Sequence, residues 1–95
     1  MQIPPERLEQ IAHRFAELEA RMASGTLEGE AFVRASRDYA ELEPVAKIAA
    51  EVKSAREEMA GLSEMLADPE MKAMAEEELA SLKATLPDLE RRLAI

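Results

Sequence analysis

The stretch from Tyr39 to Leu66, YAELEPVAKIAAEVKSAREEMAGLSEML, decides the fold because it carries the longest uninterrupted helical pattern in the chain. After Pro44 its apolar residues recur at alternating intervals of three and four, at Val45, Ile48, Val52, Ala55, Met59, Leu62 and Leu66. This is the a/d repeat of a helix that packs along its length against other helices. The pattern predicts a helix over residues 44–67.

The same intervals occur in two other parts of the chain. One set, bounded by Pro4-Pro5 and Ser24-Gly25, is Leu8, Ile11, Phe15, Leu18 and Met22. The other follows Asp68-Pro69; after Met71 and Met74 it keeps these intervals from Ala75 through Leu79, Leu82, Leu86, Leu89 and Leu93. Proline suits the first turn of a helix, aspartate suits the N-cap, and glycine commonly ends a helix. Both sets therefore predict helices, and the short Asp68-Pro69 connection predicts an antiparallel hairpin.

Two prolines interrupt these patterns. Residues 26–43 predict a short helix with Phe32 and Tyr39 on its docking face. An interior proline removes a backbone hydrogen bond and clashes with the preceding turn, so we expect a break or sharp kink at Glu43-Pro44. Whether the helices on either side are continuous stays open. The apolar phase survives Pro87, which predicts a kink there without a change of direction.

The predicted fold class is all-α. The expected architecture is an antiparallel three-helix, coiled-coil-like bundle, with one additional short helix before Pro44. The helix over residues 44–67 is expected to be the central member, packed against the first and last helices. A chain of 95 residues has room for one small domain, so residues 1–95 are expected to form a single helical domain.

The composition limits the possible partners. The net charge is −8, so the overall electrostatic field of the chain disfavours binding to nucleic acid. A basic protein surface is the favoured kind of partner. There is no cysteine, which favours an intracellular protein, and the polar start MQIPPERLEQ does not resemble a signal peptide. No apolar run approaches the roughly 20 residues that span a membrane, so no membrane association is expected.

Few residues offer catalytic chemistry. His13 is the only histidine, it falls at a solvent-facing position, and Gln10 stands where a di-metal Glu-x-x-His motif needs glutamate. Adjacent acids such as Glu57-Glu58 and Glu76-Glu77-Glu78 point in different directions on a helix, which favours solvated faces over paired carboxylates. The three glycines are isolated and form no phosphate loop. We expect no catalytic, cofactor-binding or metal-binding residue, no cofactor and no small-molecule substrate.

Two side-chain groups remain open to a functional interpretation. Arg7, Arg14 and Arg21 lie seven residues apart and form either an anion-binding edge or, as we favour, interhelical pairs with Glu51 and Glu58. Four methionines surround the predicted hairpin turn, namely Met59, Met65, Met71 and Met74. They form either an adaptable binding surface or, as we favour, filling for irregular gaps at the end of the bundle.

Three segments carry a family resemblance. They are LEQIAHRFAELEARM (residues 8–22), DYAELEPV (38–45) and MLADPEMKAMAEEELASL (65–82). In this order they resemble the N-terminal domain of bacterial class I peptide chain release factors. Within that family they resemble the type that reads UAA and UAG more closely than the second type. The resemblance covers nearly the whole chain. Pro87 is a departure, because relatives continue there as an uninterrupted Glu/Leu helix.

The resemblance implies a cytoplasmic factor that enters the ribosomal A site at a stop codon and promotes peptidyl-tRNA hydrolysis. The family reads the codon with a Pro-x-Thr loop and promotes hydrolysis with a Gly-Gly-Gln loop. This chain has no Gly-Gly pair, and its glutamines are residues 2 and 10. The fragment itself is therefore not expected to be an enzyme. It is expected to contact protein and RNA at the stalk base of the large ribosomal subunit, as a monomer or weakly self-associating chain.

Two other functions compete with this hypothesis. One is a free-standing acidic coiled-coil module for protein–protein interaction. The other is a small all-α enzyme, such as a chorismate mutase-like protein, which would need several inward-facing cations around a dianion. The a/d positions are almost wholly apolar, which disfavours the enzyme.

Overall fold

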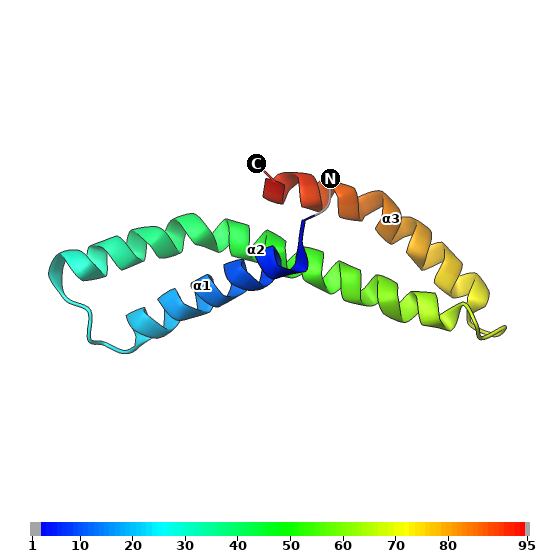
Figure 1. The fold of residues 1–95 in the computed structure, drawn as a ribbon, viewed down its shortest axis with the longest axis horizontal. Helices are drawn as coiled ribbons and strands as arrows, with labels where there is room; N and C mark the ends of the chain where they lie inside the picture. Colours follow the sequence, from blue (N-terminus) through cyan, green and yellow to red (C-terminus); the bar gives the residue numbers. More distant parts are fainter. Residues whose placement is uncertain (1–2, 95) are drawn as a thin grey trace. The chain divides into compact units, whose positions relative to one another are not determined.

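The computed structural model describes residues 3–94; residues 1, 2 and 95, which the predicted domain includes, lie outside the described part. The elements are α1 (Pro5–Ala23), α2 (Gly29–Met65) and α3 (Lys72–Ala94) (Figure 1). No strand occurs between residues 3 and 94. The predicted all-α helical class is therefore confirmed.

The chain divides into two compact units, and α2 contributes to both. The α1 unit comprises residues 4–50, in which α1 runs antiparallel to the N-terminal part of α2 (Figure 1). The α3 unit comprises, among the described residues, residue 3 and residues 51–94, in which α3 runs antiparallel to the C-terminal part of α2 (Figure 1). Within its own unit α1 thus pairs with residues 29–50, a stretch that includes the region predicted as a separate short helix.

Local chemistry explains the bounds of α1. Pro4 is the N-cap and Pro5 the first helical residue, and the amide of Arg7 donates to the Pro4 carbonyl at 3.0 Å. At the other end the amide of Ser24 donates to the Ala20 carbonyl at 3.0 Å. Gly25 then takes a positive φ of 73°, a conformation that only glycine adopts without strain. The predicted start and stop signals are confirmed.

Pro44 does not break α2, and the additional short helix predicted before it was wrong. A single helix continues from Gly29 to Met65 with Pro44 inside it. Proline has no amide hydrogen, so the carbonyl of Ala40 loses its usual backbone donor. Packing on both sides of the proline offsets this loss, because Tyr39 stacks on Phe15 before it and Ala49 is buried after it.

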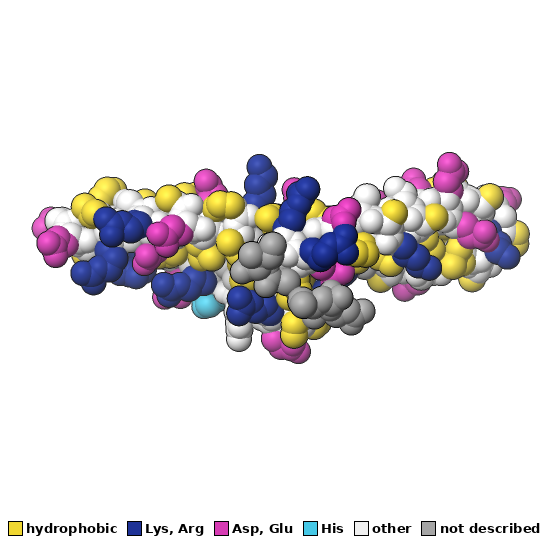
Figure 2. Space-filling view, turned by 90° about the horizontal axis from the view of Figure 1, so that it is seen from above, with side chains coloured by type: hydrophobic (Ala, Val, Ile, Leu, Met, Phe, Trp, Pro, Cys, Tyr) yellow, Lys and Arg dark blue, Asp and Glu magenta, His cyan; other side chains and the backbone are white. Residues whose placement is uncertain are grey.

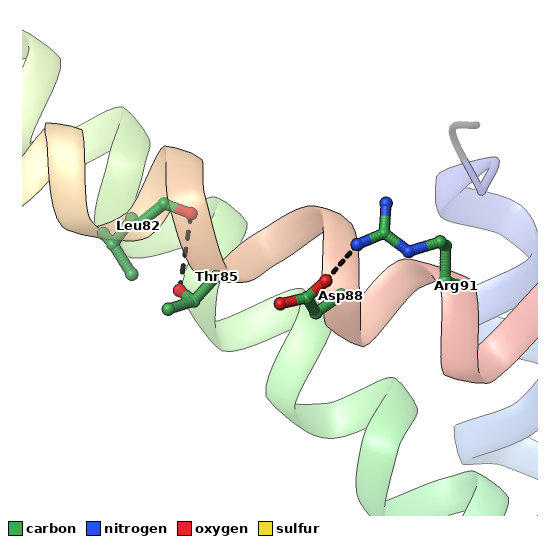
Figure 3. Close-up of polar contacts among 4 residues, drawn as sticks. All are labelled: Leu82, Thr85, Asp88 and Arg91. Atoms are coloured by element: carbon green, nitrogen blue, oxygen red, sulfur yellow. Dashed lines mark hydrogen bonds and ion pairs between the residues drawn. The ribbon is translucent and has the colours of Figure 1, made fainter.

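The α2–α3 connection follows the predicted chemistry with a shifted boundary. The amide of Glu70 donates to Asp68 Oδ1 at 3.0 Å, and the amide of Lys72 donates to the Asp68 carbonyl at 2.9 Å. Asp68 therefore caps a turn, but regular helix begins at Lys72 and not at Pro69. The α3 helix continues through Pro87, and Thr85 Oγ1 donates to the Leu82 carbonyl at 3.4 Å just before it (Figure 3).

Most of the predicted a/d positions are buried or half-buried. In the α3 unit the buried cluster is Leu62, Ala75 and Leu79, with Met59, Leu66 and Leu82 packed against it. In α1 the buried residues are Leu8, Ile11 and Leu18. Two expectations fail, because Val45 is 36% exposed and Phe32, predicted to dock its helix, is 45% exposed. Phe32 lies in the first turn of α2, which begins at Gly29.

Candidate interaction site

A groove of about 820 Å³ opens between α1 and α2 within the α1 unit. The residues that line it are Ala12, Phe15, Ala16, Glu19, Tyr39, Glu43, Pro44, Ala46, Lys47 and Ala50. On each helix the lining positions repeat at intervals of three and four residues, so each helix contributes one face. All lining residues are exposed or half-buried, so the groove is open to solvent.

An aromatic pair joins the two walls of this groove. The rings of Phe15 and Tyr39 stack with their centroids 4.8 Å apart and their planes 25° from parallel. Both side chains are half-buried. Offset stacking of this kind contributes about 0.5–1.5 kcal/mol beyond the burial of the rings. The pair therefore fixes α1 against α2 where the groove lies.

Two carboxylates give the groove its charge. Partial burial, followed by the negative charges of Glu19 and Glu43, raises the pKa of the Tyr39 hydroxyl above its ordinary value of 10.0. Removing a proton there would place a third negative charge beside the two carboxylates. Lys47 is the only basic residue in the lining. The groove thus combines an apolar floor with a mainly acidic edge.

The residues considered for catalysis lie apart from one another on exposed surfaces. His13 Nε2 is 3.9 Å from Glu17 Oε2, and the His13 side chain is 83% exposed. Lys72 Nζ is 3.9 Å from Glu76 Oε1 in a second exposed pair. Within residues 3–94 no three histidine or acidic side chains gather closely enough to hold a metal ion. Glu57 and Glu58 are exposed, as predicted for a solvated face.

The arginine stripe keeps its two interpretations. Arg7, Arg14 and Arg21 are all exposed. Their predicted partners Glu51 and Glu58 belong to the α3 unit, whereas the arginines belong to the α1 unit. The pairing stays a prediction.

The methionines near the α2–α3 turn divide between the two interpretations. Met59 packs against the buried cluster, and Met71 is half-buried, which fits the predicted gap filling. Met65 and Met74 are 38% and 40% exposed, so they do not fill the core.

Sequence reasoning missed two features. One is the ion pair between Arg56 and Glu90. The sequence could have indicated it, because these opposite charges stand directly beside the apolar positions of two helices that were predicted to be antiparallel. The other is the groove, whose signal was small residues flanking an aromatic residue. Ala12 and Ala16 flank Phe15 on α1, and Ala46 and Ala50 continue the face of Tyr39 on α2.

The order of the helical segments along the chain agrees with the family that the sequence matches. The sequence matches the PCRF domain family over residues 11–95. The chain belongs to this family. Among curated relatives, peptide chain release factor 1 of Erythrobacter litoralis is 77% identical over 95 residues, covering 100% of this chain and 27% of that protein. The same factor of Novosphingobium aromaticivorans is 59% identical over 95 residues, with the same coverage.

A more distant relative is peptide chain release factor 1 of Gluconobacter oxydans, which is 50% identical over 90 residues, 95% of this chain and 26% of that protein. This PCRF chain thus spans about a quarter of the length of the relatives that it matches. No solved structure matches it. Over the described part of the chain, none of the helices has the length and apolar character needed to cross a membrane.

Proposed function

We propose that residues 1–95 form the N-terminal domain of a peptide chain release factor of the first type, which directs translation termination at UAA and UAG codons. The observation that carries this proposal is 77% identity over the full chain to peptide chain release factor 1 of Erythrobacter litoralis. The PCRF match over residues 11–95 agrees with it. A cytoplasmic location accompanies this function.

Within such a factor the domain binds and does not catalyse. Residues 1–95 contain no Gly-Gly pair, so they hold no Gly-Gly-Gln loop. Their threonines are Thr26 and Thr85, and neither has a proline two positions before it, so they hold no Pro-x-Thr loop. Codon reading and the promotion of peptidyl-tRNA hydrolysis therefore belong to other parts of the factor. We assign no catalytic, cofactor or metal-binding role to any residue of this chain.

The proposed partner is the ribosome, at the protein and RNA of the large-subunit stalk base. A net charge of −8 favours contacts with basic ribosomal proteins over contacts with phosphates. Figure 2 shows acidic and basic side chains interspersed with apolar ones over the visible face, without a broad basic patch. We propose that the chain alone is monomeric or weakly self-associating. A free-standing coiled-coil module is less well supported, because the named relatives are release factors.

A chimeric release factor tests the proposal. The matching segment of the Erythrobacter litoralis factor is replaced by residues 1–95, and peptide release is measured on ribosomes programmed with UAA, UAG or UGA. We expect release at UAA and UAG close to that of the unmodified factor, and clearly above that of a factor lacking the segment. A chimera that performs no better than the deletion would contradict the proposal.

A further inference from the structure

We propose that the groove between α1 and α2 in the α1 unit is a docking site for an amphipathic helix of a partner protein, with a lysine or arginine beside its apolar face. The inference rests on the shape and chemistry of residues 12–50 and does not depend on the proposed function. Neither the PCRF match nor the relatives assign a site to these residues.

The groove has the dimensions of a helix seat. Its lining runs from Ala12 to Glu19 on α1 and from Tyr39 to Ala50 on α2. At about 1.5 Å per residue these stretches are roughly 10 and 16 Å long, which corresponds to two or three turns of a docked helix. A helix laid along two antiparallel helices completes a three-helix packing and presents side chains at the i, i+3, i+4 and i+7 positions.

The walls favour leucine-sized anchors. Four alanines line the groove, two on each helix, namely Ala12, Ala16, Ala46 and Ala50. Alanine leaves room for a neighbouring backbone and side chain to approach closely. The stacked rings of Phe15 and Tyr39 supply a rigid apolar floor. Burying one leucine or isoleucine side chain against such a surface contributes about 1.5–3 kcal/mol.

The charge of the groove selects a basic occupant. Glu19 on α1 and Glu43 on α2 both line the groove, so each of its two walls carries a carboxylate. Both carboxylates also raise the pKa of the Tyr39 hydroxyl. A lysine or arginine beside the apolar face of a docked helix would lie between them. A nucleic acid would bring phosphates against these carboxylates. A second copy of the chain would bring a net charge of −8 against another −8.

The probe is a synthetic helical peptide with leucines at a and d positions and lysines beside them, and its matched control carries glutamates in place of the lysines. Affinity for the 95-residue chain is measured by calorimetry, with the fluorescence of Tyr39, the only tyrosine, as a local readout. We expect the lysine peptide to bind and the glutamate peptide to bind at least tenfold more weakly.

Two pairs of variants locate the binding. The double variant Glu19→Gln with Glu43→Gln should lower the affinity for the lysine peptide about five- to tenfold. The control double variant Glu17→Gln with Glu41→Gln, on the same helices outside the lining, should lower that affinity less than about twofold. Ala16→Phe fills the groove and should abolish binding, whereas Ala20→Phe, at an exposed alanine outside the lining, should not. Circular dichroism verifies that each variant is folded.

Three outcomes would overturn the proposal. They are equal affinity for the lysine and glutamate peptides, unchanged affinity in a folded Ala16→Phe variant, and a dimer of the unmodified chain that Ala16→Phe converts to monomer. The last result would assign the groove to a second copy of the chain.

Discussion

The guanidinium of Arg56 on α2 donates a hydrogen bond to Glu90 Oε2 on α3, with nitrogen and oxygen 2.7 Å apart. The two residues are 34 positions apart in the sequence. The Glu90 side chain is only 9% exposed and the Arg56 side chain 26% exposed. Within residues 3–94, Glu90 is the buried charged residue, and its partner comes from the opposite helix of the hairpin. The pair thus sets the alignment of α3 on α2.

Arg56→Met should lower the free energy of unfolding by about 1–3 kcal/mol, because it leaves the Glu90 carboxylate largely buried without its cation. Arg56→Met combined with Glu90→Leu should cost less than the single change, since no charge is then left behind. Urea unfolding measures both. The control is Asp88→Ala, which removes the exposed pair of Asp88 with Arg91 (Figure 3) and should cost at most about 1 kcal/mol. Equal losses for Arg56→Met and Asp88→Ala would show that the buried pair has no special role.

Leu62→Ala should lower the free energy of unfolding by about 2–5 kcal/mol, because Leu62 is 5% exposed within the buried cluster of the α3 unit. Leu82→Ala should cost less, since Leu82 is only partly buried against that cluster. Ala75 is 0% exposed, so Ala75→Leu has no free space and should cost about 1–3 kcal/mol. Thermal melts compare the three variants. A melting temperature unchanged by Leu62→Ala would refute the packing register.

Gly61→Ala should raise the free energy of unfolding by about 0.5–1 kcal/mol. Gly61 lies inside α2, and a Cβ built there meets nothing within 4 Å, so alanine adds helix propensity without a clash. Gly25→Ala is the matched opposite, because Gly25 has a φ of +73° that costs a side-chain-bearing residue about 1–2 kcal/mol. In chemical unfolding experiments the free energy of unfolding should rise for Gly61→Ala and fall for Gly25→Ala. A gain in stability for Gly25→Ala would contradict the assigned turn.

Periodicity predicted most of the fold, because apolar spacing reports directly on which helical face is buried. Residues such as Leu8, Val52 and Leu79 are buried where the a/d repeat places them. The error at Pro44 has a different origin. A local rule gives the cost of an interior proline, whereas continuity of α2 also depends on tertiary contacts such as the stacking of Tyr39 on Phe15.

The candidate groove was less predictable than the helices. In the sequence its alanines look like weak core positions or like neutral surface positions. Ala16 and Ala46 line the same groove only because α1 pairs with residues 29–50. The sequence pattern predicted that the helix over residues 44–67 packs against both the first and the last helix. Individual helical faces and the α2–α3 hairpin are therefore readable from this sequence, but the pairing of α1 with residues 29–50 required the structure.

The hydroxyl of Tyr39 should titrate above 10.0 in the folded chain, because partial burial and the carboxylates of Glu19 and Glu43 disfavour the phenolate. A pKa raised in the folded state means that the folded chain holds this proton more tightly than the unfolded chain. The contribution to stability is fully present below the unfolded pKa of about 10 and is lost as the pH rises through the folded value.

Ultraviolet absorbance of the phenolate measures this titration cleanly, since the chain has a single tyrosine and no tryptophan. Burial, followed by the two carboxylates, causes the shift, so Phe15→Ala, which uncovers the ring, and Glu43→Gln, which removes a negative charge, should each lower the pKa of Tyr39. Glu41→Gln, on the same helix outside the groove lining, should leave it unchanged. The same titration in urea supplies the unfolded reference. A native curve that coincides with the urea curve while circular dichroism still reports helix would show that Tyr39 is neither covered by Phe15 nor flanked by the two carboxylates.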